Sequence, residues 1–461
     1  MVWLEHKPTM TMQSASGQTT EHNPVSFWRA TLFWLKLGFV SFGGPAGQIA
    51  IMHQELVEKR RWISEQRFLH ALNFCMLLPG PEAQQLATYI GWLMHRAWGG
   101  FIAGILFVLP SLCILITLAW IYISFGDVPA IAGVFYAIKP AVTAIVIYAA
   151  LRIGRRALNN PILLIIALVS FMAIFLFKLA FPMIIIGAAA IGFLGGRMLP
   201  EKFSNRDDHV ASQRCYGSAI IDDHTPAAAH TRFSFGKLLK VFIAGLLLWC
   251  LPMLFLNFSL GWDHTLTQMG WFFTKAALVT FGGAYAVLPY VYQGAVDYYG
   301  WTTPDQMIDG LALGETTPGP LIMIVAFVGF MGGYANQIFG PEELFLSAAL
   351  AACVVTWFTF LPSFLFIFGG GPFIETTHGD INFTAPLTAI TAAVVGVIVN
   401  LGLFFAYHVL WPQGFMGHFD WLAAVITVIA GASLILLKQN IIHVILASAI
   451  AGLGLTHLNV V

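Results

Sequence analysis

Two lysines stand inside apolar segments of the sequence, each seven residues ahead of a Gly-Gly pair. Lys36 precedes Gly43-Gly44, and Lys275 precedes Gly282-Gly283. An ammonium group held in apolar surroundings is energetically expensive and is often retained because it serves function. We therefore expect Lys36 and Lys275 to be anion partners. The alternative is that both side chains extend to the edge of the apolar layer, since each lies near the start of its segment.

Two carboxyl groups flank the two Pro-Gly-Pro triplets of the chain. Glu82 directly follows Pro79-Gly80-Pro81, and Glu315 stands three residues before Pro318-Gly319-Pro320. Carboxyl groups deep inside an apolar segment can carry protons for coupled transport. We predict that Glu82 and Glu315 are proton-coupling candidates. For Glu82, the alternative role is to stabilise the positive end of a helix that begins there.

Uncharged polar side chains surround the same motifs and can donate hydrogen bonds to the oxygens of an anion. We expect Asn73 and Thr317 to bind substrate, and Gln84 and Gln85 belong to the same class. Contacts between packed helices are the alternative role of these residues. Lys139 is a further candidate cation, with weaker support because its counterpart in the repeat described below is an alanine.

The sequence contains little that indicates other chemistry. Its five cysteines form no CxxC pair and no zinc-ligand spacing, so we predict no metal site. It has no GxGxxG that opens a helix and no CxxCH, and we therefore predict no cofactor, no catalytic residues and no enzyme activity. It also lacks the basic tract that nucleic-acid binding needs.

Composition places these residues in a membrane. The chain has 461 residues, of which 58% are hydrophobic and 10% are charged, whereas soluble domains carry about 25% charged residues. The polar stretch 1–26 lacks the apolar core of a signal peptide and is predicted to be a cytosolic tail. Nine apolar runs approach the ~20 residues that cross a bilayer: Phe101–Phe125, Ile131–Leu151, Ile162–Phe177, Met183–Leu199, Val241–Phe258, Phe345–Phe368, Leu387–Tyr407, Leu422–Leu437 and Ile441–Leu455.

The chain repeats itself. The Phe-Gly-Gly motif, a tryptophan and the Pro-Gly-Pro triplet recur at one offset of 239 residues. Matched Gly, Pro and Trp at a fixed spacing are stronger evidence of a repeat than matched apolar residues. We predict two homologous halves, 27–198 and 266–457, joined by a hydrophilic linker, 199–240, and an extra transmembrane segment, 241–258. The matched pairs are Phe42 and Phe281, Trp62 and Trp301, Pro79 and Pro318, and, after an insertion, Ser111 and Ser363.

Charge indicates that the two halves have opposite orientations. Of the 22 Lys and Arg residues, 20 precede Val241, and only Lys275 and Lys438 follow it. Because Lys and Arg collect on the cytosolic side, equivalent loops are predicted to lie inside in one half and outside in the other. The sequence therefore predicts an all-α polytopic membrane protein built as an inverted repeat, with a cytosolic N-terminus and an external C-terminus.

Each half is predicted to contain two helices that are broken near their middle. Proline removes an amide hydrogen and glycine adopts dihedrals that other residues avoid, so the FGG and PGP motifs interrupt helices. Four half-helices should begin near Pro45, Pro81, Ala284 and Pro320, where unpaired amides and the helix dipole attract anions. Re-entrant hairpins explain the basic loops better than broken spanning helices, which remain the alternative.

The ordered motifs resemble the chromate ion transporter family in its long, two-domain form. They are Phe42-Gly43-Gly44-Pro45-Ala46, Leu78-Pro79-Gly80-Pro81 and Phe107-Val108-Leu109-Pro110-Ser111, with echoes at Thr280-Phe281-Gly282-Gly283 and Thr317-Pro318-Gly319-Pro320. The resemblance implies a bacterial inner-membrane protein that exports chromate and confers chromate resistance. It also implies that the FGGP and PGP residues and their echoes form the substrate site. The second half departs from the pattern, because Ala284-Tyr285 replaces Pro45-Ala46.

Other functions stay open at this point. Sulfate and molybdate present the same charge and hydrogen-bond acceptors as chromate, so the sequence does not separate these oxyanions. Buried helix ends also suit a channel. The expected partners are the oxyanion and the lipid bilayer, and the sequence leaves a homodimer open.

Overall fold

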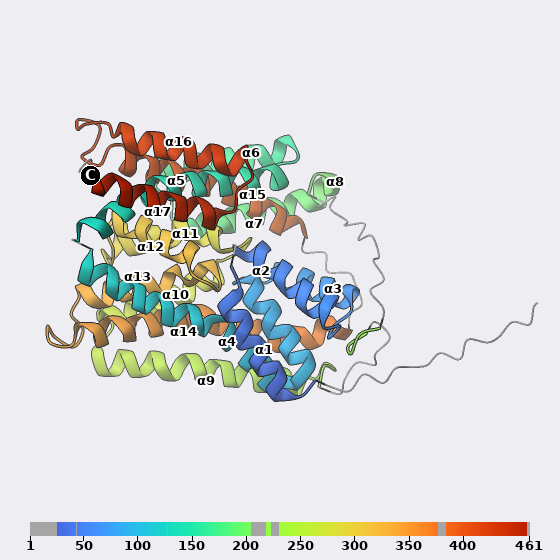
Figure 1. Ribbon diagram of the computed structural model, residues 1–461. Coiled ribbons are helices and arrows are strands. Elements are labelled where there is room, and N and C mark those ends of the chain that lie inside the picture. Colours follow the sequence, from blue (N-terminus) through green and yellow to red (C-terminus); the bar gives the residue numbers. More distant parts are fainter. Residues whose placement is uncertain are drawn as a thin grey trace, which may run out of the picture.

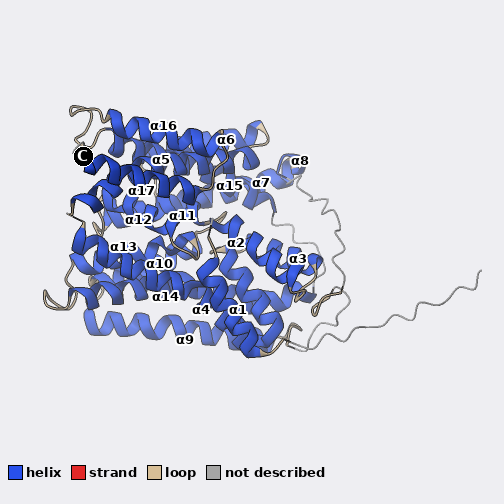
Figure 2. Ribbon diagram, viewed as in Figure 1, coloured by secondary structure: helices blue, strands red, loops and turns tan. Residues whose placement is uncertain are grey.

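The computed structural model describes residues 25–42, 44–126, 128–203, 218–222, 230–376 and 384–458. The described residues are overwhelmingly helical (Figure 2), which confirms the predicted all-α class. Among them, six helices are long and apolar enough to cross a membrane, and four more apolar helices are shorter. The chain is a multi-pass membrane protein. The predicted tail lies almost wholly outside the described residues.

The first half of the chain forms a run of helices interrupted at the Gly- and Pro-rich motifs. Its elements are α1 (Phe27–Val40), α2 (Gly44–His53), the π-helical turn η1 (Gln54–Lys59), α3 (Glu65–Leu77), α4 (Glu82–Phe125), α5 (Pro129–Ala157), α6 (Pro161–Phe177), α7 (Phe181–Met198) and the short α8 (Pro200–Phe203).

The second half repeats this order of elements. It comprises α10 (Thr265–Leu278), α11 (Ala284–Tyr292), the π-helical turn η2 (Gln293–Tyr298), α12 (Pro304–Thr316), the 3-10 turn η3 (Leu321–Met323), α13 (Ile324–Ala335), α14 (Leu344–Thr376), α15 (Thr384–Leu410), α16 (Trp421–Ile435) and α17 (Ile441–His457). The bounds of α12 and η2 follow those of α3 and η1 by the same 239 residues as the sequence motifs. The caps correspond as well, because Ser64 caps α3 and Thr303 caps α12.

The predicted spans correspond to helices of unequal length. Each of the nine apolar runs overlaps one helix, but α6, α16 and α17 have only 15 to 17 residues. Helix α9 (Phe235–Leu260) connects the halves and begins before the predicted segment 241–258. The indole N–H of Trp357 on α14 donates a hydrogen bond to the Leu248 carbonyl of α9 at 3.3 Å. This bond holds α9 against the outside of α14.

Helix α4 is a hairpin rather than one straight rod. His95 and Arg96 leave helical geometry, and Arg96 takes a φ of 57° and a ψ of −157°. The two arms pack closely through glycine, because a Cβ on Gly91 would lie 2.5 Å from the Gly99 carbonyl oxygen. Small residues allow such close approach of helix backbones in membrane proteins. The Pro-Gly-Pro triplet before α4 therefore leads into a short helix that turns back on itself.

The helices form two groups that each mix both halves (Figure 1). One group contains α5 to α7 with α15 to α17, and the other contains α1, α4, α9, α10, α13 and α14. Helices α11 and α12 lie between the groups and contact both. The halves are thus intertwined, and their broken elements occupy the layer between the two groups.

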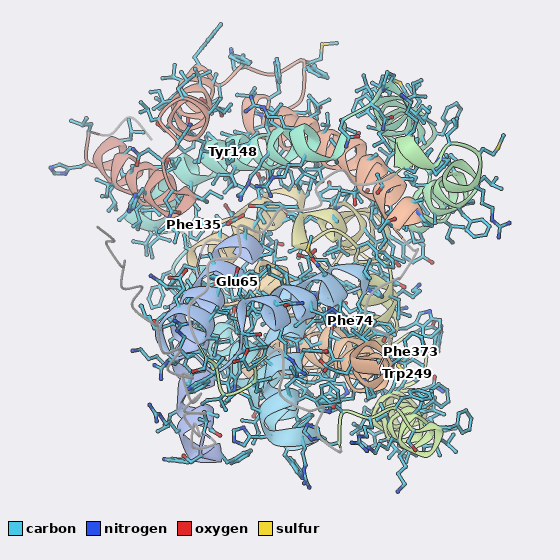
Figure 3. The ribbon with its side chains drawn as sticks, turned by 90° about the vertical axis from the view of Figure 1, so that its right-hand side faces the viewer. Glu65, Phe74, Phe135, Tyr148, Trp249 and Phe373 are labelled. Carbon is cyan, nitrogen blue, oxygen red and sulfur yellow. The ribbon has the colours of Figure 1, made fainter. Side chains whose placement is uncertain are left out.

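Two apolar clusters fill the interior. One surrounds the packing of α1, α3 and the first arm of α4, and the other extends through most of the remaining helices. Figure 3 looks onto the end that carries α3. In this view Tyr148 of α5 projects above Glu65 and Phe74 of α3, and Trp249 of α9 and Phe373 of α14 project below them.

Part of the predicted linker contacts the first half. The Ser64 amide donates a hydrogen bond to the Ile221 carbonyl at 2.9 Å, and the Ile221 amide donates to the Trp62 carbonyl at 3.0 Å. Residues 218–222 therefore lie beside the segment that joins η1 to α3.

Candidate functional site

The broken elements of the two halves meet and exchange two hydrogen bonds. The Gly80 amide donates to the Thr280 carbonyl at 2.8 Å, and the Gly319 amide donates to the Ser41 carbonyl at 2.8 Å. Gly80 and Gly319 are equivalent in the repeat, and so are Ser41 and Thr280. Each Pro-Gly-Pro triplet is thus bonded to the FGG break of the opposite half. We call this contact the junction.

Both junction glycines are required by conformation and by space. Gly80 has a φ of 126° and Gly319 a φ of 103°, values that side chains with a Cβ rarely adopt. A Cβ on Gly80 would lie 2.5 Å from the Ser363 Oγ, and one on Gly319 would lie 2.7 Å from the Ser111 Cβ. Ser111 and Ser363 are themselves equivalent, so the serine of each Leu-Pro-Ser motif faces the glycine of the other half's triplet.

Helices begin on every side of the junction. Helix α2 starts at Gly44, α4 at Glu82, α11 at Ala284, and η3, which continues as α13, starts at Leu321. The first turn of a helix has unpaired amides and the positive end of its dipole. A Cβ on Gly44 or on its equivalent Gly283 would meet nothing within 4 Å, so both breaks have free space beside them.

The junction also contains buried polar atoms that lack a hydrogen-bond partner. Among the described residues, these include the Oγ atoms of Ser41 and Ser111 and the Oε1 atoms of Gln48 and Gln85. The amide of Gln48 donates to the Gly319 carbonyl, and that of Gln85 donates to the Pro79 carbonyl at 2.8 Å. Buried polar groups normally find partners, so the free hydroxyls of Ser41 and Ser111 are suited to bind a ligand.

A carboxyl group lies beside the break of the second half. The Tyr285 hydroxyl donates a hydrogen bond to Glu315, which is buried. Arg152 of α5, an exposed residue, lies within electrostatic range of Tyr285. Tyr285 occupies the position of Ala46 in the first half, so the departure from the first motif adds a polar contact. Arg152 is not among the anion partners predicted from the sequence.

The hydroxyls of the two threonines before the second triplet donate hydrogen bonds to backbone carbonyls of their own helix, α12. Thr317 donates to the Gly314 carbonyl at 3.2 Å, and Thr316 donates to the Leu313 carbonyl at 3.0 Å. Thr317, Pro318 and Pro320 are buried, and Thr316 is half-buried. Each hydroxyl would have to break its hydrogen bond to an α12 carbonyl before it could donate to a substrate.

The structure does not bring every predicted site residue to the junction. Lys36 is exposed on α1 without a hydrogen bond or ion pair to the described residues, and Asn73 is exposed on α3. Lys275 is half-buried, with its Nζ 5.7 Å from the centre of the Trp271 ring. Gly43 lies outside the described residues. Lys139 lies elsewhere, in an ion-paired cluster described below.

The remaining predicted residues lie in the breaks or at the helix starts beside them. Pro45 is in the first turn of α2, and Pro81 precedes the first residue of α4. Gly282 and Gly283 have φ values of 77° and 96°, so the second break also uses the left-handed region. Glu82 is the first residue of α4, where a negative charge stabilises the helix.

Comparison with known proteins identifies the family. The family model described as "Chromate transporter" matches residues 28–193 and 267–453. The chain belongs to the chromate transporter family. Both matched stretches contain an FGG break and a Pro-Gly-Pro triplet, so the junction is formed by the parts of the chain that match this family.

Curated relatives match over most of their length. The chain is 31% identical to the chromate transport protein of Pseudomonas aeruginosa, over 95% of each chain. It is 27% identical to the chromate transport protein of Cupriavidus metallidurans, over 84% of each chain. It is 29% identical to the probable chromate transport protein of Synechococcus elongatus, over 85% of this chain and 88% of the relative. No solved structure matches the chain.

Proposed function

We propose that this protein exports chromate from the cytosol across a bacterial inner membrane and so confers chromate resistance. The junction carries this proposal, because helix starts of both halves converge there with the unpartnered hydroxyls of Ser41 and Ser111. Membership of the chromate transporter family and the names of its relatives supply the substrate. Another tetrahedral oxyanion, such as sulfate, remains the alternative substrate, because the junction would present the same donors to it.

The energetics favour several weak donors acting together. Each helix N-terminus contributes about 0.3–1 kcal/mol to anion binding, and up to about 2 kcal/mol when partly buried. A hydrogen bond to a charged group contributes about 1.5–3 kcal/mol. Four helix starts and the hydroxyls of Ser41 and Ser111 therefore offset a substantial part of the cost of removing water from a dianion.

Fixed positive charge would provide the rest of the stabilisation. Lys36 and Lys275 lie on the helices that lead to the two breaks, and Arg152 lies within electrostatic range of Tyr285 beside the second break. We propose that Arg152 and the two lysines attract chromate toward the junction. Within the same scheme, Glu82 and Glu315 are the carboxyl groups that exchange protons near the substrate.

The reciprocal hydrogen bonds support an inverted repeat. Two halves that donate equivalent amides to equivalent carbonyls are related by an approximate two-fold axis, and the uneven distribution of Lys and Arg orients that axis in the membrane plane. The segments 27–198 and 266–457 are then the two halves, with N-terminus inside and C-terminus outside. In such transporters, movement of one group of helices against the other exposes a central site to each side in turn.

Uptake of radiolabelled chromate into everted membrane vesicles tests the function. We expect chromate to accumulate in energised vesicles that contain the protein, and to be lost when the membrane is uncoupled. Excess sulfate should inhibit only in part. Vesicles that contain folded protein but accumulate sulfate and not chromate would transfer the proposal to the other oxyanion. Accumulation of neither anion would refute export of oxyanions.

A further inference from the structure

A second polar cluster lies away from the junction, at the end of the molecule where α4 ends and α5 begins. It borders a cavity of about 570 Å³. The walls of this cavity come from α4, α5, α12 and α13. The polar residues that line it are Tyr122, Tyr136, Lys139, Gln306, Asp309 and Tyr334.

Asp309 of α12 is the buried centre of this cluster, with an exposed fraction of 2%. The Tyr122 hydroxyl donates to the Asp309 Oδ2 at 2.9 Å. The Lys139 Nζ lies 3.6 Å from the same oxygen and 3.4 Å from the Oδ1 of Asp305, a carboxyl group near the surface. One lysine thus stands between two carboxyl groups of the same helix, a turn apart.

The carboxylate of Asp309 is poorly satisfied as an anion. Its Oδ1 has no hydrogen-bond partner among the described residues, whereas an ionised carboxylate offers about four acceptor sites. The lysine lies too far from Oδ2 for a hydrogen bond by the usual distance limit. A buried charge costs free energy unless it is both paired and hydrogen-bonded. A bound proton on Oδ1 would remove this charge.

The surroundings of Asp309 contain few other charges. Tyr122 comes from α4, Lys139 from α5 and Asp305 from α12 itself, while Tyr334 of α13 borders the same cavity. In the described part of α13, α15 and α17, which also pack against α12, no side chain forms an ion pair or hydrogen bond with Asp309. Besides its burial and the Tyr122 hydroxyl, the groups that act on the protonation of Asp309 are therefore Lys139 and Asp305.

We propose that Asp309 is a proton-binding site reached through this cavity, and that proton binding to Asp309 leaves the Lys139 ammonium paired with Asp305 alone. The use of this proton in transport rests on the function proposed above, whereas the binding of the proton does not. On the orientation proposed above, the cavity opens to the external side.

Helix α12 connects this site to the junction. It carries Asp309 and Glu315, and only Thr317 separates its end from the triplet whose Gly319 amide donates to the Ser41 carbonyl. Asp309 and Glu315 are six residues apart, about 9 Å along the helix. A change in the ion pair between α5 and α12 therefore acts on the element that carries both the inner carboxyl group and the junction glycine.

The opposite end of the molecule offers a matched control. There the Tyr89 hydroxyl donates to the Glu375 Oε1 at 2.5 Å, and the Arg67 Nη1 lies 3.8 Å from the Oε2. This cluster has the same three kinds of group, but its cation is an arginine, which stays protonated. Glu375 also does not border the cavity. Glu375→Gln removes a carboxylate from a similar cluster without touching Asp309.

Infrared difference spectra of the reconstituted protein, taken between mildly acidic and mildly alkaline buffer, test proton binding directly. We expect a protonated-carboxyl C=O band that appears on acidification, keeps its intensity in Glu375→Gln and loses a component in Asp309→Asn. Lys139→Met should shift the pH at which this component appears. Identical bands in the wild type and in Asp309→Asn would overturn the proposal.

Proteoliposomes loaded with chromate separate the two proposals. In chromate exchange at equal pH, the wild type and Asp309→Asn should be similar. In accumulation driven by a pH gradient, Asp309→Asn should lose at least tenfold and Glu375→Gln should not. Absence of exchange in the wild type would refute chromate transport and leave the infrared result to decide proton binding. Full gradient-driven accumulation by Asp309→Asn would refute its role in coupling.

Discussion

Substitution of one junction glycine tests whether the crossing of the two halves is needed for transport. In Gly80→Ala, the new Cβ would lie 2.5 Å from the Ser363 Oγ and 2.7 Å from the Gln85 Nε2, at a φ of 126°. Either the Gln85 amide and the Ser363 hydroxyl turn away, which breaks the bond from Gln85 to the Pro79 carbonyl, or the backbone moves away from Thr280, whose carbonyl accepts the Gly80 amide. The substitution therefore acts on the bond between the halves and leaves the charged groups in place.

The expected magnitude follows from two terms. A residue held in an unfavourable φ/ψ region costs about 1–3 kcal/mol, and an extra methyl group in a packed site costs about 1–3 kcal/mol. Together they disfavour the observed junction by about 2–6 kcal/mol. Since about 1.4 kcal/mol corresponds to a factor of ten, we expect the initial rate of chromate uptake to fall at least about 30-fold.

The assay is initial uptake into everted vesicles, divided by the amount of folded protein in the membrane. Gly44→Ala is the matched control, because Gly44 has a φ of 68° and its Cβ would meet nothing within 4 Å. It retains backbone strain without the close contact, so its loss should be smaller. Adding Ser363→Ala to Gly80→Ala removes the nearest atom and should restore part of the rate.

Normal uptake by Gly80→Ala would refute the reasoning, because the junction could then rearrange without effect on transport. Equal losses in Gly80→Ala and Gly44→Ala would also contradict it. In that case backbone strain alone, and not contact between the halves, would control the rate. Loss of the protein from the membrane is measured in the same samples and is corrected for in the rate.

Three further predictions concern orientation and binding. In a cysteine-free background, Asn159→Cys and Met416→Cys, in equivalent exposed loops, should react with an impermeant thiol reagent from opposite sides of the membrane; reaction from one side would exclude an inverted repeat. Ser111→Ala should raise the chromate concentration needed for half-maximal uptake about tenfold, since it removes a hydroxyl worth about 1.5 kcal/mol or more to an anion; an unchanged value would place the anion elsewhere. Lys36→Met should weaken uptake and Lys36→Arg should preserve it, and equal activity of both would show that Lys36 is no anion partner.

The sequence predicts the breaks in the helices because their cause is local. Glycine and proline change the backbone wherever they stand, so helices end before and begin after the FGG and PGP motifs. The recurrence of elements was visible for the same reason, since the offset of 239 residues relates residues that shape the backbone. Apolar runs likewise predict most helices.

Contacts between distant segments could not be predicted. The turn of α4 at His95 and Arg96 contains neither glycine nor proline, and it depends on the close packing of Gly91 and Gly99. Ser111 recurs in the repeat as Ser363, yet a serine in an apolar helix more often packs than binds. The recurrence of the Leu-Pro-Ser motif was thus a usable signal that Ser111 matters. That Ser111 lies opposite Gly319 could be seen only in the folded structure.

The charged residues show the same limit. Lys36 and Lys139 have similar sequence surroundings, but Lys36 is exposed and Lys139 lies between Asp305 and Asp309. Which carboxyl group a lysine meets depends on the packing of α5 against α12, and no local pattern encodes it. Asp309 therefore did not stand out in the sequence, although it is more deeply buried than Glu82.

The position of a bound chromate ion is the most direct test of this account. Crystals of the protein soaked in chromate would give an anomalous-difference peak at the chromium absorption edge. We predict a peak at the junction, within hydrogen-bond distance of the Ser41 or Ser111 hydroxyl and beside the first turns of α2 and α11. A peak confined to another place, such as the cavity beside Lys139, would contradict the proposed site.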